Sequence, residues 1–553
     1  MRRFKGGLSR CARLRRWDAH GRRMPVCLGL SIFRPWAISS PPCGFPATLV
    51  SGCRMPDDHN PREPAFVKTF FPDILTGAAA RWRLISSGAA GFVLVVSVSF
   101  ALRAYLGVVG RQIHHPDEIF QTIEQAHRFV FGFGILPWEY HEGIRWLGTP
   151  LLLTPPFLAA AALGQGPEFY IPVLRVLLAA FSLLPAVLFF RIAREQFGDG
   201  KAAVAAVLPL FWHENLYFST ITLSDSIAAV PFAMAAMLPL TFRPETGNRR
   251  IAAFAFLCAL TFAMRFHLAP ALAFVFIVAL ISLTPAQRKV LIVASAACAL
   301  ALAALDLVFG AYPFRHIYLN FSRNIFDGVA ATFGTEPWYF YPVMIWNNAG
   351  LAMLLVIAVL ITAIRWQWRL VLPALIVIGC FSLIGHKEYR FTYPATLLLS
   401  FAAAWSVLEL QARYRANDRR KLVSPILVVA ALVLVVIAVN LPRYRTLLTE
   451  REDNIATASL AASHREDICG LAWISNGGDI FFSGGYAYFH RDVPFEAFKP
   501  LAFGESAANR FNYALAHPLY ALVLSGAYTI DTCWSLGHSA PVCLLRRPGG
   551  CRG

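Results

Sequence analysis

The hydrophobic residues of this chain are gathered into long runs that alternate with short polar segments. A bilayer is crossed by about 17 to 25 consecutive apolar residues, and eleven runs approach or exceed that length. They cover residues 86–109, 170–191, 201–217, 221–242, 250–267, 269–284, 288–311, 346–364, 369–385, 391–411 and 421–441. We therefore expect an all-α polytopic membrane protein with about eleven transmembrane helices. Residues 148–163 are also apolar but short and rich in proline, so we expect an interfacial or re-entrant helix there.

The charged residues orient these predicted spans. With eleven spans and the N-terminus inside, fifteen Lys and Arg residues fall in cytoplasmic loops, as the positive-inside rule requires. Counting residues 148–163 as a span would instead place Arg81 and Arg83 outside, if the later loops keep their orientation. The fifteen cations are Arg191, Arg194, Lys201, Arg243, Arg249, Arg250, Arg288, Lys289, Arg365, Arg369, Arg413, Arg415, Arg419, Arg420 and Lys421.

This orientation leaves four segments on the outer face. Two are long loops, residues 110–169 and 312–345, and the others are the turn 386–390 and the chain from about residue 442. The two long loops are rich in aromatic and acidic residues, so we expect the chemistry of the protein on this face.

The overall composition agrees with a membrane protein. The chain is 57% hydrophobic and only 15% charged, whereas soluble proteins carry about 25% charged residues, so soluble globular and disordered proteins are excluded. The net charge of +18 would suggest nucleic acid, but ten of these charges lie in residues 1–54. Because fifteen of the remaining cations are explained by topology, we expect the bilayer as a partner and no nucleic acid.

Three regions are predicted. Residues 1–80 form a disordered, basic N-terminal tail, in which two interpretations stay open for residues 1–54: a true tail, or a leader that is not translated because Met55 is the start. A targeting or RNA-binding arm is a further alternative. Residues 81–441 form the transmembrane catalytic domain, and residues 442–553 form a small extracytoplasmic α/β domain.

The C-terminal region combines strand and turn signals. Ile468–Trp473, Ala521–Ser525 and Val542–Leu545 are strand candidates, and the Gly-Gly pairs at 477–478 and 484–485 mark turns. In an oxidising compartment a disulfide among Cys469, Cys533 and Cys543 is expected, with the pairing left open.

The first candidate for catalysis lies in loop 110–169. Pro116, Asp117 and Glu118 combine proline at a first helical position with two acids in the first turn, which predicts a helix over residues 116–132. Acids at such a position commonly do no more than complement the helix dipole. Their place just beyond a span, beside Trp138, Glu139 and Tyr140, also suits a carboxylate that acts as a general base.

The second candidate is the turn His386-Lys387-Glu388-Tyr389-Arg390. Cations here are not required by the positive-inside rule, although Lys, Arg and Tyr also form interfacial belts. We favour a site for a lipid phosphate, with Arg390 as a planar fork, Lys387 as a point charge and Glu388 in support. Arg265, near the outer end of a predicted span, is a further intramembrane charge.

The third candidate is an aromatic run, Trp338-Tyr339-Phe340-Tyr341, in loop 312–345. Such a run can be a membrane-interface belt or can shape a groove for a sugar or a polyprenyl chain. Both interpretations stay open.

Together these motifs resemble the Alg9/PIG-B-like mannosyltransferases, glycosyltransferase family 22 of the GT-C superfamily. The resemblance covers roughly residues 80–440 and rests on motifs that occur in the family's order. They are His115-Pro-Asp-Glu118 with Gln121, Phe131-Gly-Phe-Gly134, Trp138-Glu-Tyr140, Gly143-Ile-Arg145, Gly334-Thr-Glu-Pro-Trp338-Tyr-Phe-Tyr341 and His386-Lys-Glu-Tyr-Arg-Phe391 with Tyr393-Pro394.

The resemblance implies a GT-C-type inverting mannosyltransferase. Such an enzyme would move mannose from a polyprenyl or dolichyl phosphate to a glycan or glycolipid acceptor, with Asp117, beside Glu118, as the base. Donor phosphate would be bound by His386, Lys387, Arg390 and Arg265, supported by Glu388. The expected sugar and acceptor contacts are His115, Gln121, Trp138, Glu139, Tyr140, Arg145, Trp338 and Tyr339.

We expect no cofactor and no metal, because no DxD triad accompanies the outer clusters and a lipid monophosphate leaving group needs cations more than a proton donor. The chain departs from the eukaryotic pattern in its α/β tail and in Arg265-Phe266-His267, where the family often has Arg-Pro-Thr. These departures favour a bacterial inner-membrane protein with a periplasmic site over an endoplasmic reticulum protein with a lumenal site.

Two other functions are considered. A lipid or glycolipid transporter would also have many spans, but we find no inverted repeat and the polar clusters lie at one interface. Another GT-C transferase, of the protein-mannosyl or aminoarabinose type, would share the first-loop acid but not the His-Lys-Glu-x-Arg-Phe turn.

Overall fold

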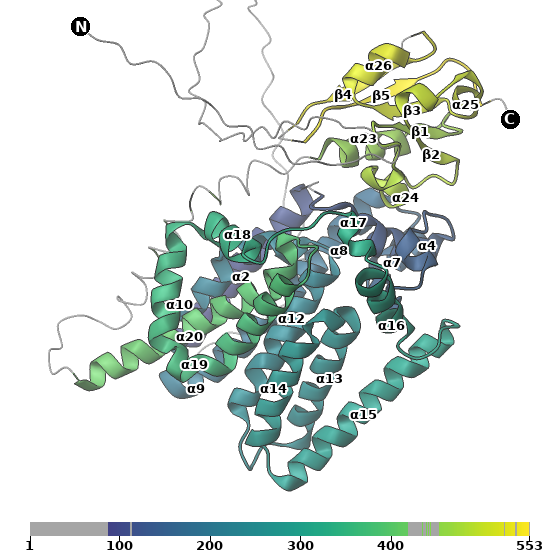
Figure 1. Cartoon of the computed structure of the whole chain (residues 1–553). Coiled ribbons are helices and arrows are strands. Elements are labelled where there is room, and N and C mark those ends of the chain that lie inside the picture. The colour runs from purple at the N-terminus through teal and green to yellow at the C-terminus, as the bar shows by residue number, and fades with distance from the viewer. Residues whose placement is uncertain are drawn as a thin grey trace, which may run out of the picture. The chain divides into compact units, whose positions relative to one another are not determined.

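The computed structural model describes residues 87–551 apart from 111–112, 418–433, 435–437, 439–440, 442, 444–452, 525 and 537–538. The predicted tail of residues 1–80 lies outside the described residues, and so does nearly all of the last predicted span, 421–441. Within the described part, helices precede a small sheet-containing domain, shown in yellow in Figure 1.

The apolar runs fold as helices that pack side by side in the lower part of Figure 1. Helix α19 joins two helices across a kink at Gln367, so two of the predicted spans meet there. The principal helices are α2 Ser87–Val109, α8 Pro167–Phe181, α9 Leu184–Phe197, α10 Asp199–Phe211, α11 His213–Tyr217, α12 Ser224–Met237, α13 Asn248–Met264, α14 Ala269–Ser282, α15 Pro285–Val308, α19 Leu351–Leu383 and α20 Tyr393–Asn417.

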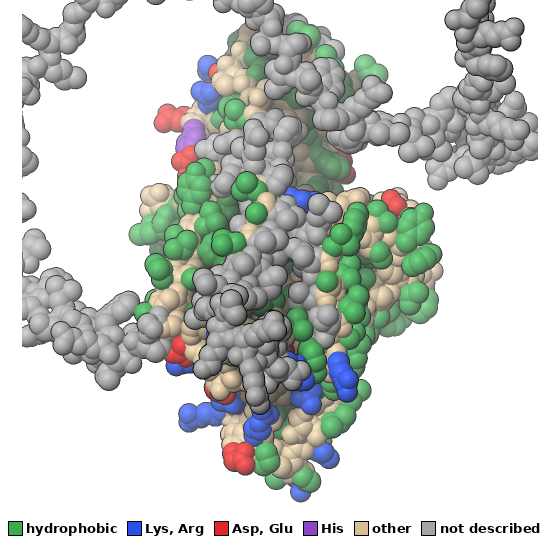
Figure 2. Space-filling view, turned by 90° about the vertical axis from the view of Figure 1, so that its left-hand side faces the viewer, with side chains coloured by type: hydrophobic (Ala, Val, Ile, Leu, Met, Phe, Trp, Pro, Cys, Tyr) green, Lys and Arg blue, Asp and Glu red, His purple; other side chains and the backbone are tan. Residues whose placement is uncertain are grey.

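Six helical segments in the described part are long and apolar enough to cross a membrane: Gly88–Val109, Pro167–Phe197, Ser224–Thr241, Pro285–Val308, Ile364–Leu383 and Tyr389–Arg413. Several other predicted spans form shorter helices, such as α13 and α14. The polytopic helical architecture is therefore confirmed, whereas the count of eleven stays a prediction. On the face shown in Figure 2, apolar side chains lie along both flanks of the middle part, and Lys and Arg gather at the end opposite the sheet domain.

Small residues bring the central helices close together. Ala202 and Ala206 of α10 and Ala228 and Ala233 of α12 are fully buried in the main hydrophobic core. Alanine allows helix backbones to approach closely where no hydrophobic effect drives helices together in lipid. This packing gives the outer-face segments a rigid support.

Shorter helices make up the segments that the sequence predicts on the outer face, the outer-face segments. The predicted helix 116–132 is present as α3 Pro116–Glu118, the π-helical turn η1 Ile119–Ile123 and α4 Glu124–Phe131, and it ends at Gly132 in the left-handed conformation. The proline-rich stretch 148–163 forms α6 Gly148–Leu152 and α7 Pro155–Leu163, each too short to cross a bilayer. The others are α5 Trp138–His141, α16 Arg315–Phe321, η5 Ser322–Phe326, α17 Val329–Thr332 and α18 Phe340–Ala349.

The C-terminal domain is an α/β fold with one five-stranded sheet in the order β2-β1-β3-β5-β4. Strand β1 is parallel to β2 and β3, while β5 is antiparallel to β3 and β4. Its elements are α23 Asn454–Ser463, β1 Leu471–Ile474, η7 Ile480–Phe482, α24 Gly485–Phe489, β2 Phe495–Phe498, η8 Pro500–Ala502, α25 Glu505–Arg510, β3 Tyr513–Ala516, α26 Pro518–Leu524, β4 Thr529–Trp534 and β5 Val542–Arg546.

One strand prediction in this domain was wrong. Residues 521–524 of the predicted strand are helical instead, because Pro518 begins helix α26, in which Ala521 is buried while Leu519 and Leu522 are exposed, a helical periodicity. Strands overlap the other two candidates. Two disulfides are present, Cys469–Cys551 and Cys533–Cys543, so Cys469 pairs with a cysteine outside the predicted three.

Glu124 joins the outer-face helices to the C-terminal domain. Its buried carboxylate accepts hydrogen bonds from the backbone N–H groups of Ile135 (2.7 Å), Ala487 (2.8 Å) and Tyr486 (3.3 Å). Burial raises the pKa of Glu124 to about 7, although these donors act in the opposite direction. Gly485 has a positive φ, and a side chain there would meet the Glu124 carboxylate.

We predict that Glu124→Ala loosens this contact. The substitution leaves three backbone N–H groups without an acceptor, at a cost of about 1–3 kcal/mol for each buried group. Limited proteolysis of the full chain should then cleave residues 454–551 faster than in the wild type. Glu168→Ala is the matched control, because its ion pair with His464 is exposed and worth little. Equal cleavage of the Glu124→Ala variant and the wild type would contradict the role of Glu124.

Candidate active site

A cavity of about 490 Å³ opens among the outer-face segments. The helical region contributes the start of α3, the α5 segment and the turn between α19 and α20. Asp479, Phe481 and Phe482 enter from the C-terminal domain, which closes one side. The cavity therefore brings together two of the predicted motifs, which lie more than 250 residues apart.

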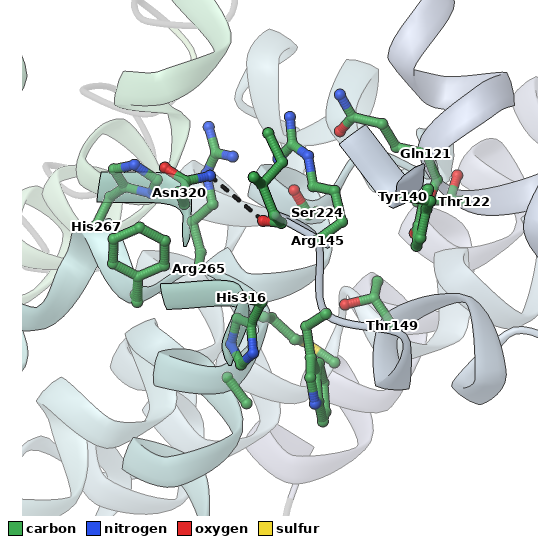
Figure 3. A pocket seen from close by; sticks show the side chains of 15 residues that line it. Gln121, Thr122, Tyr140, Arg145, Thr149, Ser224, Arg265, His267, His316 and Asn320 are labelled. Carbon is green, nitrogen blue, oxygen red and sulfur yellow. Dashed lines mark hydrogen bonds between the residues drawn. The ribbon is translucent and has the colours of Figure 1, made fainter. Parts of the chain in front are cut away.

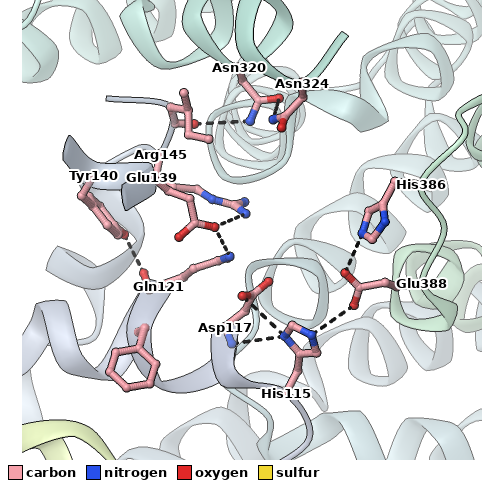
Figure 4. A network of polar contacts seen from close by, with 12 residues as sticks. His115, Asp117, Gln121, Glu139, Tyr140, Arg145, Asn320, Asn324, His386 and Glu388 are labelled. Carbon is pink, nitrogen blue, oxygen red and sulfur yellow. Dashed lines mark hydrogen bonds and ion pairs between the residues drawn. The ribbon is translucent and has the colours of Figure 1, made fainter. Parts of the chain in front are cut away.

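Asp117 is the carboxylate that the first motif places in this cavity. Its Oδ2 lies 2.5 Å from Nη2 of Arg390, and its Oδ1 lies 3.4 Å from Nδ1 of His115 (Figure 4). The Asp117 backbone N–H also donates to His115 Nδ1, which caps the helix. Burial alone would raise the pKa of Asp117, but Arg390 and His115 outweigh it and hold the pKa below its usual range. Asp117 is therefore ionised at neutral pH.

Arg390 is held by two carboxylates. Besides Asp117, its Nε lies 2.7 Å from Oε2 of Glu388, and its side chain is almost fully buried. His386 Nε2 lies 3.1 Å from Oε1 of Glu388 (Figure 4), while its Nδ1 lies 3.1 Å from the carbonyl oxygen of Gly334.

These contacts shift two pKa values in opposite directions. The hydrogen bond to Glu388 raises the pKa of His386. Burial acts against ionisation of Glu388, but its hydrogen bond with His386 and the charge of Arg390 lower its pKa to about 2. The turn thus keeps a negative Glu388 between two cationic side chains when His386 is protonated.

Lys387 lines the cavity, but its ammonium is already engaged. It donates to the carbonyl oxygens of Glu336 (2.8 Å), Ile384 and Gly385. Lys387 therefore ties the loop before α18 to the turn after α19.

Arg145 and Arg265 present further positive charge to the cavity. Nη2 of Arg145 lies 3.2 Å from Oε1 of Glu139, and its buried Nε has no partner among the described residues. Nε of Arg265 lies 2.6 Å from Oδ1 of Asp225, and its guanidinium lies over the ring of Phe391.

A small pocket of about 30 Å³ continues from the cavity, and both arginines line it together with His316 (Figure 3). Gln121 and Tyr140 also line this pocket. Gln121 donates to Glu139, and the Tyr140 hydroxyl donates to the Gln121 carbonyl. Both residues therefore help to position Glu139 for its ion pair with Arg145.

Three predicted site residues line neither the cavity nor this small pocket. Glu118 is buried on the other side of α3, where it lies 3.6 Å from Arg175 and accepts a hydrogen bond from the His114 backbone. Trp338 and Tyr339 are 70% and 51% exposed. Of the aromatic residues in that loop, Phe333 lines the cavity instead, and its ring lies 6.2 Å from that of Trp138.

Sequence reasoning missed the contributions of two segments. Asn320 and Asn324, from α16 and η5, line the cavity, and Asn320 donates to the Ile144 carbonyl. Asp479, Phe481 and Phe482 follow directly after the Gly477-Gly478 turn, which was the available signal for a loop in the C-terminal domain.

Comparisons with known proteins identify a family and several relatives that are similar to this chain. Residues 94–474 match the model of the Alg9-like mannosyltransferase family. "GPI mannosyltransferase 3" of Yarrowia lipolytica is 31% identical over 58% of this chain and 63% of that relative. "GPI alpha-1,2-mannosyltransferase 3" of Xenopus laevis is 26% identical over 50% of this chain and 53% of that relative. The chain thus spans less than two thirds of either relative.

One solved structure shares the fold. The crystal structure of ArnT from Cupriavidus metallidurans bound to undecaprenyl phosphate superposes with a TM-score of 0.53 at 12% sequence identity. The match covers 83% of this chain and 98% of that one. The predicted GT-C-type fold, with its helical membrane region and C-terminal sheet domain, is thereby confirmed.

The His386 pair predicts a pH dependence that can be measured without a substrate. Because Glu388 raises the pKa of His386, the imidazole stays protonated below that raised value and becomes neutral only as the pH rises through it. Diethyl pyrocarbonate modifies neutral imidazole, so the midpoint of His386 modification, followed by mass spectrometry, should lie above the ordinary histidine value of about 6.5. Glu388→Gln should lower this midpoint.

The matched control is Glu336→Gln, which changes a carboxylate on the neighbouring loop that makes no ion pair with His386 within the described chain. Its midpoint should equal that of the wild type. A Glu388→Gln midpoint equal to that of the wild type would show that Glu388 does not hold the proton.

Proposed function

Because the chain belongs to the Alg9-like mannosyltransferase family, we propose that it is an inverting mannosyltransferase whose site lies on the non-cytoplasmic face of its membrane. Mannose is transferred from a polyprenyl-phosphate donor to a glycolipid acceptor. The observation that carries this proposal is the ionised carboxylate of Asp117 in a cavity that also contains buried guanidinium groups. A single base beside cations suits inversion with a phosphate leaving group.

Asp117 is the general base. The acceptor oxygen forms a bond to the anomeric carbon of mannose while the bond from that carbon to the phosphate oxygen breaks. The hydroxyl proton passes to Asp117, and the bonding electron pair leaves with the lipid phosphate. Asp117 needs to be ionised before the reaction and to accept the proton late, as the new bond forms.

Arg145 and Arg265 bind the donor phosphate in this proposal. Each contacts one carboxylate, Glu139 or Asp225, and retains further N–H groups for an anion. Arg265 lies near enough to Arg145 and Arg390 for their charges to repel one another, and a phosphate among them would relieve that repulsion.

The predicted roles of the last motif change accordingly. Arg390, held by Asp117 and Glu388, orients the base, and Lys387 ties two loops together. Protonated His386 adds positive charge at the edge of the cavity. The proposal includes no metal ion, since these side chains supply the positive charge that the leaving group needs.

The acceptor is proposed to be a mannose-containing glycolipid, in line with the names of the two relatives. Both relatives come from eukaryotes, so they do not support the bacterial origin that the sequence departures favoured. The proposal keeps the prediction that the site lies on the lumenal or periplasmic side of the membrane.

Asp117→Asn should lower transfer by about 10²–10⁴-fold, the usual contribution of a general base. The measurement is transfer of labelled mannose from polyprenyl-phosphate mannose to glycolipid in membranes that contain the variant. Asp327→Asn is the control, because it alters an exposed outer-face carboxylate paired only with Arg323 in the described chain. Turnover of Asp117→Asn at the wild-type rate would remove Asp117 from its role.

Arg145→Gln should raise the donor KM by about tenfold or more, because a charge-assisted hydrogen bond contributes about 1.5–3 kcal/mol. The acceptor KM should change little. Glu139 keeps its hydrogen bond from Gln121 in this variant, so the site retains its local structure. Arg323→Gln, on the exposed surface of η5, is the control. If the donor KM of Arg145→Gln matches that of the wild type, the phosphate is bound elsewhere.

A further inference from the structure

A second cavity of about 490 Å³ lies between the outer-face helices and the C-terminal domain. It adjoins the catalytic cavity, because His115, Pro116, Phe481 and Phe482 line both. The remaining wall comes mainly from the C-terminal domain, from the end of β1, the start of α26 and the start of β5. The roles assigned to the catalytic residues do not account for this space.

The wall that the domain supplies is aromatic with a few polar groups. Trp473, His517 and Tyr520 line the cavity together with Ser475 and Asn476. Aromatic walls with a small number of polar groups are typical of sites for organic ligands, and aromatic rings can stack on the apolar face of a sugar ring.

Trp473 adds an independent observation. It is 7% exposed, and its indole Nε1–H has no hydrogen-bond partner among the described residues. A buried donor without a partner costs free energy, and because Nε1 is closed to solvent here, a ligand oxygen satisfies it once the Trp473 ring turns toward the cavity. Asn476 is exposed just after β1 and lines the same cavity, so its amide is a further polar group there.

The stereochemistry of the proposed reaction favours the acceptor as the ligand of the second cavity. An inverting transfer requires the acceptor to approach from the face of the sugar opposite the leaving phosphate. In Figure 4, Asp117 lies between Arg145, assigned to the phosphate, and His115, which borders the second cavity. An acceptor in the second cavity would therefore reach the base from the side opposite the phosphate.

We propose that the second cavity binds the terminal sugars of the acceptor glycan and that the C-terminal domain supplies its sugar-binding wall. This inference rests on the proposed mannosyltransferase function. The matched family region ends at residue 474, so Asn476, His517 and Tyr520 lie beyond it. The domain thus selects the acceptor, while the helical region supplies the base and the phosphate site.

The test uses the full chain in lipid nanodiscs and Tyr520→Ala. Binding of soluble mannotriose, followed by saturation-transfer NMR, should weaken by about tenfold, as expected for the loss of one aromatic contact. The KM for an octyl dimannoside acceptor should rise by a similar factor, with the KM for polyprenyl-phosphate mannose unchanged. Tyr520→Phe keeps the ring and should restore both values.

Two further variants distinguish an effect on the cavity from an effect on the folding of the domain. Leu522→Ala, on the exposed side of the same helix, is the matched control and should behave as the wild type. Asn476→Ala changes an exposed cavity residue and should raise the acceptor KM without affecting thermal unfolding. Unchanged mannotriose binding and acceptor KM in both Tyr520→Ala and Asn476→Ala would overturn the inference.

Failure of the inference and failure of the proposed function give different results. If the wild type transfers no mannose but binds mannotriose in a manner that depends on Tyr520, the function is wrong and the sugar site stands. If transfer proceeds while mannotriose binding is independent of Tyr520 and Asn476, the function stands and the sugar site is wrong. A cavity that holds an acyl chain would give this second result.

Discussion

The buried ion pairs of Arg390 hold together the site on which the rest of this structure depends. They join Asp117, just after the first described span, to Glu388 in the turn before α20, and Arg390 itself lies 273 residues from Asp117 in the sequence. A buried arginine is tolerated only when it is paired, and removing one partner of such a pair costs about 3–5 kcal/mol. The interaction therefore keeps Asp117 ionised and holds together two loops that are far apart in the sequence.

The other charged residues around Arg390 have separate roles. Glu139 and Asp225 hold Arg145 and Arg265 without using all of their N–H groups, so these two arginines can still receive an anion. Lys387 uses its charge on backbone carbonyls and stabilises the loop before α18. A site with nearly balanced charges can be buried, and its free N–H groups can still bind the phosphate that we propose.

The C-terminal domain extends this arrangement beyond the helical region. Glu124 holds the domain through the backbone N–H groups of Tyr486 and Ala487, and Phe481 and Phe482 then form a wall shared by two cavities. The family region ends within the first strand of the domain. The domain is thus placed where it can change the acceptor while the chemistry stays the same.

The sequence by itself determined the helical membrane architecture and the helix at residues 116–132, and it singled out Asp117 and the His386–Arg390 turn as candidates for the site. Hydropathy, proline positions and the order of motifs are local signals, and local signals are sufficient for these features. Only the tertiary structure decided which charges meet. It turned Glu118 toward Arg175, left Trp338 on the surface, brought Phe481 into the cavity and made a helix of residues 521–524. These outcomes depend on packing between segments that are far apart in the chain, which spacing along one segment does not record.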